Sequence, residues 1–137
     1  MVATNEKNLW LIPSELDLAA AELELSSQEN YLVKLREALN NLSKNYGLSA
    51  ILIDCPPSLN ILTVNAMVSA HGALVPLQSE FFALEGLSQL MLTIREIRDT
   101  ANPNLRIEGV VLTMYDSRNN LSQQVETDAR DNLGELV

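Results

Sequence analysis

The stretch AILIDCPPS, residues 50–58, is the part of the sequence around which we expect the chain to be organised. Its first half is apolar and rich in β-branched residues, which is typical of a strand buried on both faces of a sheet. The run ends on the carboxylate of Asp54, and Pro56 and Pro57 then stop the strand because proline has no backbone N–H to donate. We therefore expect Asp54 at the carboxyl end of a central strand, the edge where open α/β sheets bind ligands.

A carboxylate in this position favours magnesium chemistry. Mg²⁺ is usually held by one or two carboxylates together with waters and substrate phosphates. Nucleotide hydrolases place such an aspartate at a strand end, in the Walker B arrangement. The alternative is that Asp54 caps the next helix. The two prolines directly after Asp54-Cys55 favour the ligand role over the cap.

Length and composition predict one soluble, globular domain over residues 1–137. No apolar run approaches the ~20 residues of a membrane span, so we expect no membrane partner. The single cysteine, Cys55, excludes an internal disulfide and fits a reducing cytoplasm. A net charge of −9 argues against a broadly basic surface for nucleic acid, although it leaves room for a local basic patch.

Apolar periodicity predicts strands that alternate with helices. Such alternation favours an α/β fold with parallel pairing through right-handed crossovers. Ser14 and Ser58 are the expected N-caps of two helices, and Gly47 the expected end of another. Residues 1–7 are expected to fray. The expected strands are 9–12, 50–53, 73–77 and 107–114. The expected helices are a short amphipathic one after Ser14, with Leu16, Ala19, Ala20 and Leu23 as its apolar positions, and then 29–46, 59–70, 83–101 and 121–133.

The chain resembles the C-terminal part of a ParA/Soj-type chromosome and plasmid partitioning ATPase, in the deviant-Walker group that also holds MinD. Four segments carry the resemblance in order, at residues 8–25, 51–67, 74–90 and 102–125. It implies a three-layer, P-loop-NTPase-like α/β fold, with a mostly parallel sheet flanked by helices. We expect that sheet to be incomplete here, with the first P-loop strand and the last strand missing.

The resemblance also implies a function. Members of this family bind ATP with Mg²⁺, dimerise with ATP, hydrolyse it slowly, bind DNA non-specifically and respond to a ParB-type partner. This implies a cytoplasmic, nucleoid-associated protein. The family's Walker A segment, K-G-G-x-G-K-T/S-T, has no counterpart among the isolated glycines of this chain. Because that loop cradles the phosphates, we expect the chain alone neither to bind ATP tightly nor to hydrolyse it, and we assign no catalytic residue.

Five residues are candidates for the nucleotide and DNA sites that the resemblance implies. Asp54 matches the Walker B aspartate, which holds Mg²⁺ through water, and Pro56 matches the start of switch II. Met114 and Asp116 lie where relatives contact the adenine base. An Asx turn is an equally weighted alternative for Asp116. Arg118 matches basic residues that hold DNA, and its alternative is a solvated loop charge.

Three further side chains are interpreted as structural. Cys55 is expected to be small and buried rather than a nucleophile, since no basic group is evidently placed to activate it. Phe81 and Phe82 are expected in the core or in an interface.

Two other functions compete with the ATPase. The first is a non-catalytic, truncated interaction module that keeps partner-binding helices without nucleotide turnover. The second is a receiver-like phospho-acceptor, because Asp54 would end a central strand in that class too. Receivers also need an acidic pair after the first strand, and residues 13–15 are Pro, Ser and Glu, so this function is disfavoured.

Overall fold

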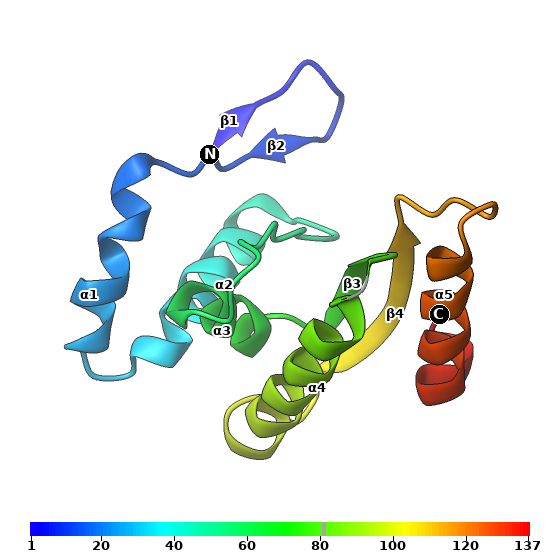
Figure 1. The fold of residues 1–137 in the computed structure, drawn as a ribbon. Helices are drawn as coiled ribbons and strands as arrows, with labels where there is room; N and C mark the ends of the chain where they lie inside the picture. The colour runs from blue at the N-terminus through cyan, green and yellow to red at the C-terminus, as the bar shows by residue number, and fades with distance from the viewer. Residues whose placement is uncertain (81) are drawn as a thin grey trace. The chain divides into compact units, whose positions relative to one another are not determined.

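The structure, a computed structural model, describes residues 1–80 and 82–137, and it leaves the burial of the Leu16 and Ala19 side chains undescribed. The chain divides into two compact units, Met1–Tyr31 and Leu32–Val137 (Figure 1). Each unit is described by itself. The division does not test the expectation of one domain over residues 1–137, which stays a prediction.

The first unit holds a short antiparallel hairpin and a short helix. Strand β1 (Val2–Ala3) pairs with β2 (Trp10–Leu11). The 3₁₀-helix η1 (Leu16–Ala19) and helix α1 (Ala21–Ser26) follow. Val2 pairs with Leu11 and Ala3 with Trp10, and the expectation that residues 1–7 fray stays a prediction.

Two expectations in this unit are wrong: the burial of the strand at residues 9–12 and the helix cap at Ser14. Trp10 and Leu11 are 41% and 55% exposed, because a strand is buried only where a second layer covers it. The short connection between β1 and β2 allows antiparallel pairing, which needs no crossover. Ser14 is not the N-cap residue of η1: that position is Glu15, which makes no side-chain capping bond.

The second unit contains the elements that the sequence predicts best. Helices α2, α3, α4 and α5 and strands β3 and β4 each lie within a few residues of their expected bounds. Gly47 follows α2 with φ +60°, as the sequence predicts for a helix end. The bounds are η2 (Tyr31–Val33), α2 (Lys34–Tyr46), α3 (Ile61–Ser69), β3 (Gly72–Gln78), α4 (Ala83–Thr100), β4 (Arg106–Thr113), α5 (Asn120–Leu133) and η3 (Gly134–Leu136).

Strands β3 and β4 pair in parallel and are joined through α4, which confirms the predicted α/β class with a parallel sheet (Figure 1). Val75, Leu77 and Val110 point to one face of this sheet and form a core with residues of α4 and α5. Residues of the opposite face are open: Leu74 is 66% exposed and Val111 is 46% exposed. Both helices therefore cover the same side of the pair.

A second core joins α3, α4 and the beginning of β4. Its buried members are Met67, Val68, Ile94, Ile97 and Leu105. Because residues of α3 contribute to it, the helix that follows Asp54 is anchored to the rest of this unit. Burying these side chains provides on the order of 1.5–3 kcal/mol each.

Residues 50–53 do not form the predicted central strand. They have no regular secondary structure, and Leu52 is 97% exposed. A strand exists only where a neighbour satisfies its backbone N–H and C=O groups. Among the described residues β3 pairs with β4 and with no other strand, so residues 50–53 form no ladder with either of them.

Candidate functional site

The loop after β4 holds three of the predicted site residues. Met114 directly follows the last strand residue, Thr113, with φ +52°, and it is 80% exposed. A positive φ is uncommon for a residue with a long side chain, and it turns the chain abruptly out of the strand. Asp116 and Arg118 lie a few residues further along the same loop, at the carboxyl end of β4.

Asp116 and Arg118 form a forked ion pair. The guanidinium Nε donates to Oδ1 of Asp116 at 3.0 Å and Nη2 donates to Oδ2 at 2.9 Å. The backbone N–H of Arg118 donates to the same Oδ1 at 2.9 Å, which closes an Asx turn. The Arg118 side chain, followed by its backbone N–H, lowers the pKa of the Asp116 carboxyl. The Asx-turn interpretation of Asp116 is therefore confirmed, and its contact with adenine stays a prediction.

Further hydrogen bonds fix the rest of this loop. The N–H of Asn119 donates to the carbonyl of Asp116 at 2.9 Å. The Asn119 side chain accepts from the N–H of Leu121 at 2.9 Å and so caps α5. Gln123 reaches back from α5 and donates to the carbonyl of Ser117 at 2.6 Å. The loop is thus tied to the helix that follows it.

Tyr115 and Glu126 add a second tie between the loop and α5. Interaction between the Tyr115 hydroxyl and the Glu126 carboxylate raises the pKa of Tyr115 and lowers that of Glu126. Arg130 pairs with Glu126 at 3.0 Å and donates to the carbonyl of Val137 at 2.7 Å. The i, i+4 spacing of Glu126 and Arg130 is that of a helical ion pair. The sequence did not indicate the contacts that Tyr115 and Val137 make with these two residues.

Asp54 and Pro56 lie on a different segment and are exposed. No hydrogen bond or ion pair of the described residues joins Asp54 to the loop after β4. Cys55 is exposed, so the expectation that it is buried is wrong. Desolvation, followed by the adjacent Asp54 charge, raises the pKa of the Cys55 thiol, which disfavours the reactive thiolate.

The helix after Asp54 is capped by Asn60 and not by Ser58. The Asn60 side chain accepts from the backbone N–H of Thr63 at 3.1 Å, and α3 begins at Ile61. The prediction for Ser58 is wrong because the chain stays non-helical for two more residues. An asparagine just before an apolar run was the signal that could have identified this cap.

The described residues fit only part of a magnesium–nucleotide site. The exposed carboxylate of Asp54 suits Mg²⁺ held through water, since Mg²⁺ takes few protein carboxylates. No three His, Cys, Asp or Glu side chains of the described residues gather into a metal site. A phosphate cradle needs clustered backbone N–H groups, and the five glycines are far apart in the sequence. These residues alone therefore do not fit a complete MgATP site.

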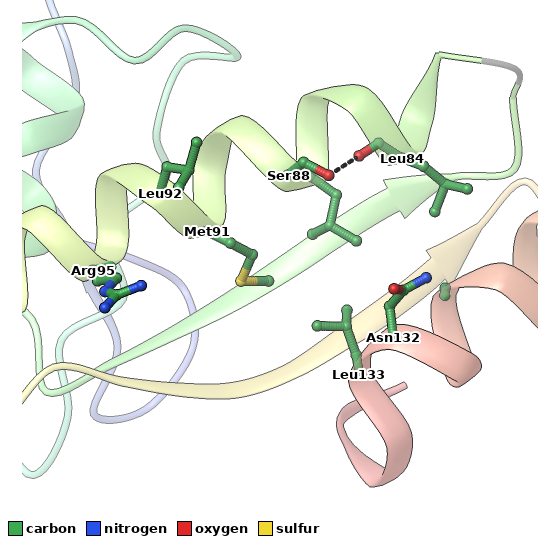
Figure 2. Close-up of a pocket in the computed structure, with 9 residues that line it drawn as sticks. Leu84, Ser88, Met91, Leu92, Arg95, Asn132 and Leu133 are labelled. Atoms are coloured by element: carbon green, nitrogen blue, oxygen red, sulfur yellow. Dashed lines mark hydrogen bonds between the residues drawn. The ribbon is translucent and has the colours of Figure 1, made fainter.

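A groove that the sequence did not predict lies between α4 and α5. It has a volume of about 470 Å³ and a mostly apolar lining (Figure 2). Figure 2 shows Met91 and Leu133 facing each other across it, and Ser88 bonded to the carbonyl of Leu84 at 2.8 Å. The lining residues are Leu84, Leu87, Ser88, Met91, Leu92, Arg95, Ala129, Asn132 and Leu133.

The two phenylalanines before α4 were expected in the core or in an interface. Phe81 lies outside the described residues. Phe82 is 73% exposed, so its placement in the core is wrong, because it precedes the first turn of α4 and not its buried stripe. Its role in an interface stays a prediction.

The parallel pair β3–β4, covered on one face by α4 and α5, defines an α/β protein whose polar loop residues follow the carboxyl end of a strand. A sequence model of the AAA domain family matches residues 1–107, and the chain belongs to this family. The predicted relationship to ParA/Soj-type chromosome partitioning ATPases is confirmed by the curated relatives.

Three comparisons illustrate this relationship. Chromosome partitioning protein ParA of Caulobacter vibrioides is 52% identical over 136 residues, which are 99% of this chain and 51% of that protein. Sporulation initiation inhibitor protein Soj of Bacillus subtilis is 47% identical over 90% of this chain and 48% of its own length. Cobyrinic acid a,c-diamide synthase from Mycobacterium smegmatis, solved with ADP and magnesium, has a TM-score of 0.80 at 39% identity, over 90% of this chain and 49% of that one.

The chain spans about half the length of the curated relatives that it matches. No helix in the described part of the chain has both the length and the apolar character needed to cross a membrane.

Proposed function

We propose that this chain is part of a partitioning ATPase that acts on chromosomes or plasmids in the cytoplasm, at the nucleoid. The proposed cycle is the one implied by its family: ATP-dependent dimerisation, non-specific DNA binding and slow hydrolysis stimulated by a ParB-type partner. The observation that carries the proposal is 52% identity to the ParA of Caulobacter vibrioides over 99% of this chain.

Asp54 is proposed to hold Mg²⁺ through water, with Pro56 at the start of the adjoining switch. Two observations support this role. Asp54 ends an apolar segment and is exposed, so its oxygens are accessible to a hydrated cation. The M. smegmatis protein with the same fold was solved with ADP and magnesium. The metal, when bound, would neutralise phosphate charge, while Asp54 would orient its water shell.

Asp116 and Met114 are proposed to contact the adenine base. A carboxylate offers about four lone-pair sites. Arg118 uses two on Oδ1 and one on Oδ2, which leaves one site on Oδ2 for a further donor. The exocyclic amine of adenine could use that site without breaking the ion pair. The exposed Met114 side chain next to it offers an apolar surface for the ring.

A chimaera tests the proposed function. This chain would replace the matching 136 residues of the ParA of C. vibrioides, in cells that lack their own copy. We expect the chimaera to support chromosome segregation, and its Asp54→Asn variant to fail while accumulating to the same level. A chimaera that accumulates normally and leaves chromosomes mis-segregated would contradict the proposal.

The alternative function is a non-catalytic interaction module. The five glycines of these 137 residues are isolated and offer no cradle for the phosphates of ATP. Under either function we predict that the 137-residue chain alone binds MgATP weakly and does not hydrolyse it. Calorimetric titration with MgATP measures this directly. Micromolar binding would contradict the prediction and exclude the interaction module as the better description.

A further inference from the structure

The groove between α4 and α5 has one wall built from a continuous stripe of α4. The lining positions on that helix recur at a spacing of three or four residues, from Leu84 to Arg95. Such spacing places side chains on one face of a helix, and at 1.5 Å per residue the stripe is about 16 Å long. Residues of α5 form the opposite wall, where Leu133 faces Met91 (Figure 2). The groove is therefore elongated, with apolar side chains on both sides.

Arg95 is the only charged residue among the nine described residues that line this groove. Figure 2 shows it at one end of the groove, with its guanidinium projecting from the same side of α4 as the Met91 side chain. Arg95 forms no ion pair or hydrogen bond with the described part of the chain, and Asp99, one turn further along α4, is not paired with it. Because a guanidinium has only donors to offer, it is available to an anionic ligand.

The size of the groove favours a small ligand over a segment of protein. Its volume of about 470 Å³ lies within the range of about 300–1,000 Å³ that is typical of small-molecule sites. A helix with its side chains is about 10–12 Å across, so three turns of helix would occupy more than about 1,000 Å³. The walls require a ligand with an apolar body, and Arg95 requires one with an anionic end. A carboxylate suits that end, because its two oxygens match the fork of the guanidinium.

We propose that the groove between α4 and α5 binds a medium-chain carboxylate, with its acyl chain between the apolar walls and its head group on the Arg95 guanidinium. This inference rests on the groove alone and is independent of the proposed function. The walls by themselves would accept any apolar molecule of suitable size, since the hydrophobic effect is non-directional. Arg95 adds selection for a negative head group at one end of the acyl chain.

Decanoate is the probe, added to the 137-residue chain below the concentration at which it forms micelles. The ε-methyl signals of the methionines in a carbon-13 NMR spectrum report where it binds. Met91 lines the groove, whereas Met67 is buried in the other core and Met114 is exposed after β4. We expect the Met91 signal to shift and saturate, while the signals of Met67 and Met114 stay in place. Octanoate should bind more weakly, by up to about fourfold for each methylene removed.

Two substitutions and one altered probe test the head group and the groove separately. Arg95→Gln should weaken decanoate binding about 1.5- to 5-fold, the range that corresponds to exposed ion pairs. Arg98→Gln is the matched control and should leave the affinity unchanged, since Arg98 is exposed on α4 and does not line the groove. Decylamine has the same chain length and the opposite charge, so it should bind more weakly than decanoate. Ser88→Trp fills the groove from an exposed position and should abolish the Met91 shift.

Several results would overturn the inference. These are the absence of a saturable Met91 shift, equal shifts of Met91 and Met114, and equal losses of affinity in Arg95→Gln and Arg98→Gln. Binding of decylamine as tight as that of decanoate would also overturn it, because the groove would then not select the head group. A Met91 signal that moves with protein concentration in the absence of decanoate would show that a second copy of the chain occupies the groove instead.

Discussion

Asn102 joins three parts of the second unit through one buried side chain. It is 8% exposed. Its amide nitrogen donates to the carbonyls of Met67 at 3.0 Å and Ala70 at 2.8 Å, at the end of α3. Its own backbone N–H donates to Ile97 in α4 at 2.8 Å. The side chain thus satisfies carbonyls that the end of α3 leaves open.

Replacing Asn102 with alanine should lower the free energy of unfolding by about 1–3 kcal/mol, because two buried carbonyls lose their donor. Urea denaturation followed by circular dichroism measures this. Asn104→Ala is the matched control: Asn104 is exposed in the same turn, so its change should stay within about 0.5 kcal/mol. Equal losses in the two variants would contradict the role of the Asn102 bonds.

The pH dependence of the Asp116–Arg118 pair has a definite sign. The pKa of Asp116 is lowered in the folded chain, mainly by the Arg118 side chain. The pair therefore contributes stability at pH values above the ordinary aspartate pKa of about 3.9, and the contribution is lost as pH falls through the lower, folded value. We expect a carbon-13 NMR titration to place the pKa of the Asp116 carboxyl below about 3.9. Arg118→Ala should raise that pKa towards 3.9. An unchanged midpoint in Arg118→Ala would show that the ion pair is not the cause.

In strand β3, Pro76 interrupts the backbone donors along one edge. In a parallel ladder, alternate residues of a strand bond to the same neighbour. The carbonyl of His71 and the N–H of Ser79 both bond to β4, so Pro76, at the opposite parity, faces the other edge. Proline has no N–H to donate there, which interrupts the donors that this open edge offers to another chain.

Two variants of the segment before α3 test whether Asn60 is the N-cap residue of this helix. Asn60→Ala removes the acceptor of the Thr63 N–H and should destabilise the chain by about 1 kcal/mol. Ser58→Ala is the matched control and should change stability by less than about 0.5 kcal/mol. Thermal unfolding of both variants measures the difference. A larger loss of stability in Ser58→Ala than in Asn60→Ala would contradict the Asn60 cap and support Ser58 as the N-cap residue.

The two compact units should differ in stability. The buried residues of both cores lie between Met67 and Ala129, and residues 1–31 contribute none of them among the described residues. We expect amide hydrogens of residues 1–31 to exchange quickly, while those of β3, β4 and α4 exchange slowly, since local opening is governed by buried apolar contact. Hydrogen–deuterium exchange with mass spectrometry measures this. Equal protection in the β1–β2 hairpin and in β3 would contradict it.

Across the whole molecule, the sequence was sufficient to predict those elements whose apolar pattern lies within the element itself. The helical stripe of α4 and the β-branched runs of β3 and β4 predicted their elements within a few residues. An Asx turn was one of the two interpretations of Asp116 from the sequence, and Asp116 closes such a turn. The fork to Arg118 and the Asn102 bonds could not be predicted, because each depends on which of several polar residues comes within reach after packing.

The sequence by itself determined the α/β class and the parallel pairing of β3 with β4, since apolar periodicity and the crossover length are local properties. Only the tertiary structure decided that residues 50–53 are not a strand and that Leu52 is exposed. The physical reason is that a strand forms only when it pairs with another strand. An apolar run favours burial, but its backbone forms a ladder only when a neighbouring strand supplies the complementary donors and acceptors.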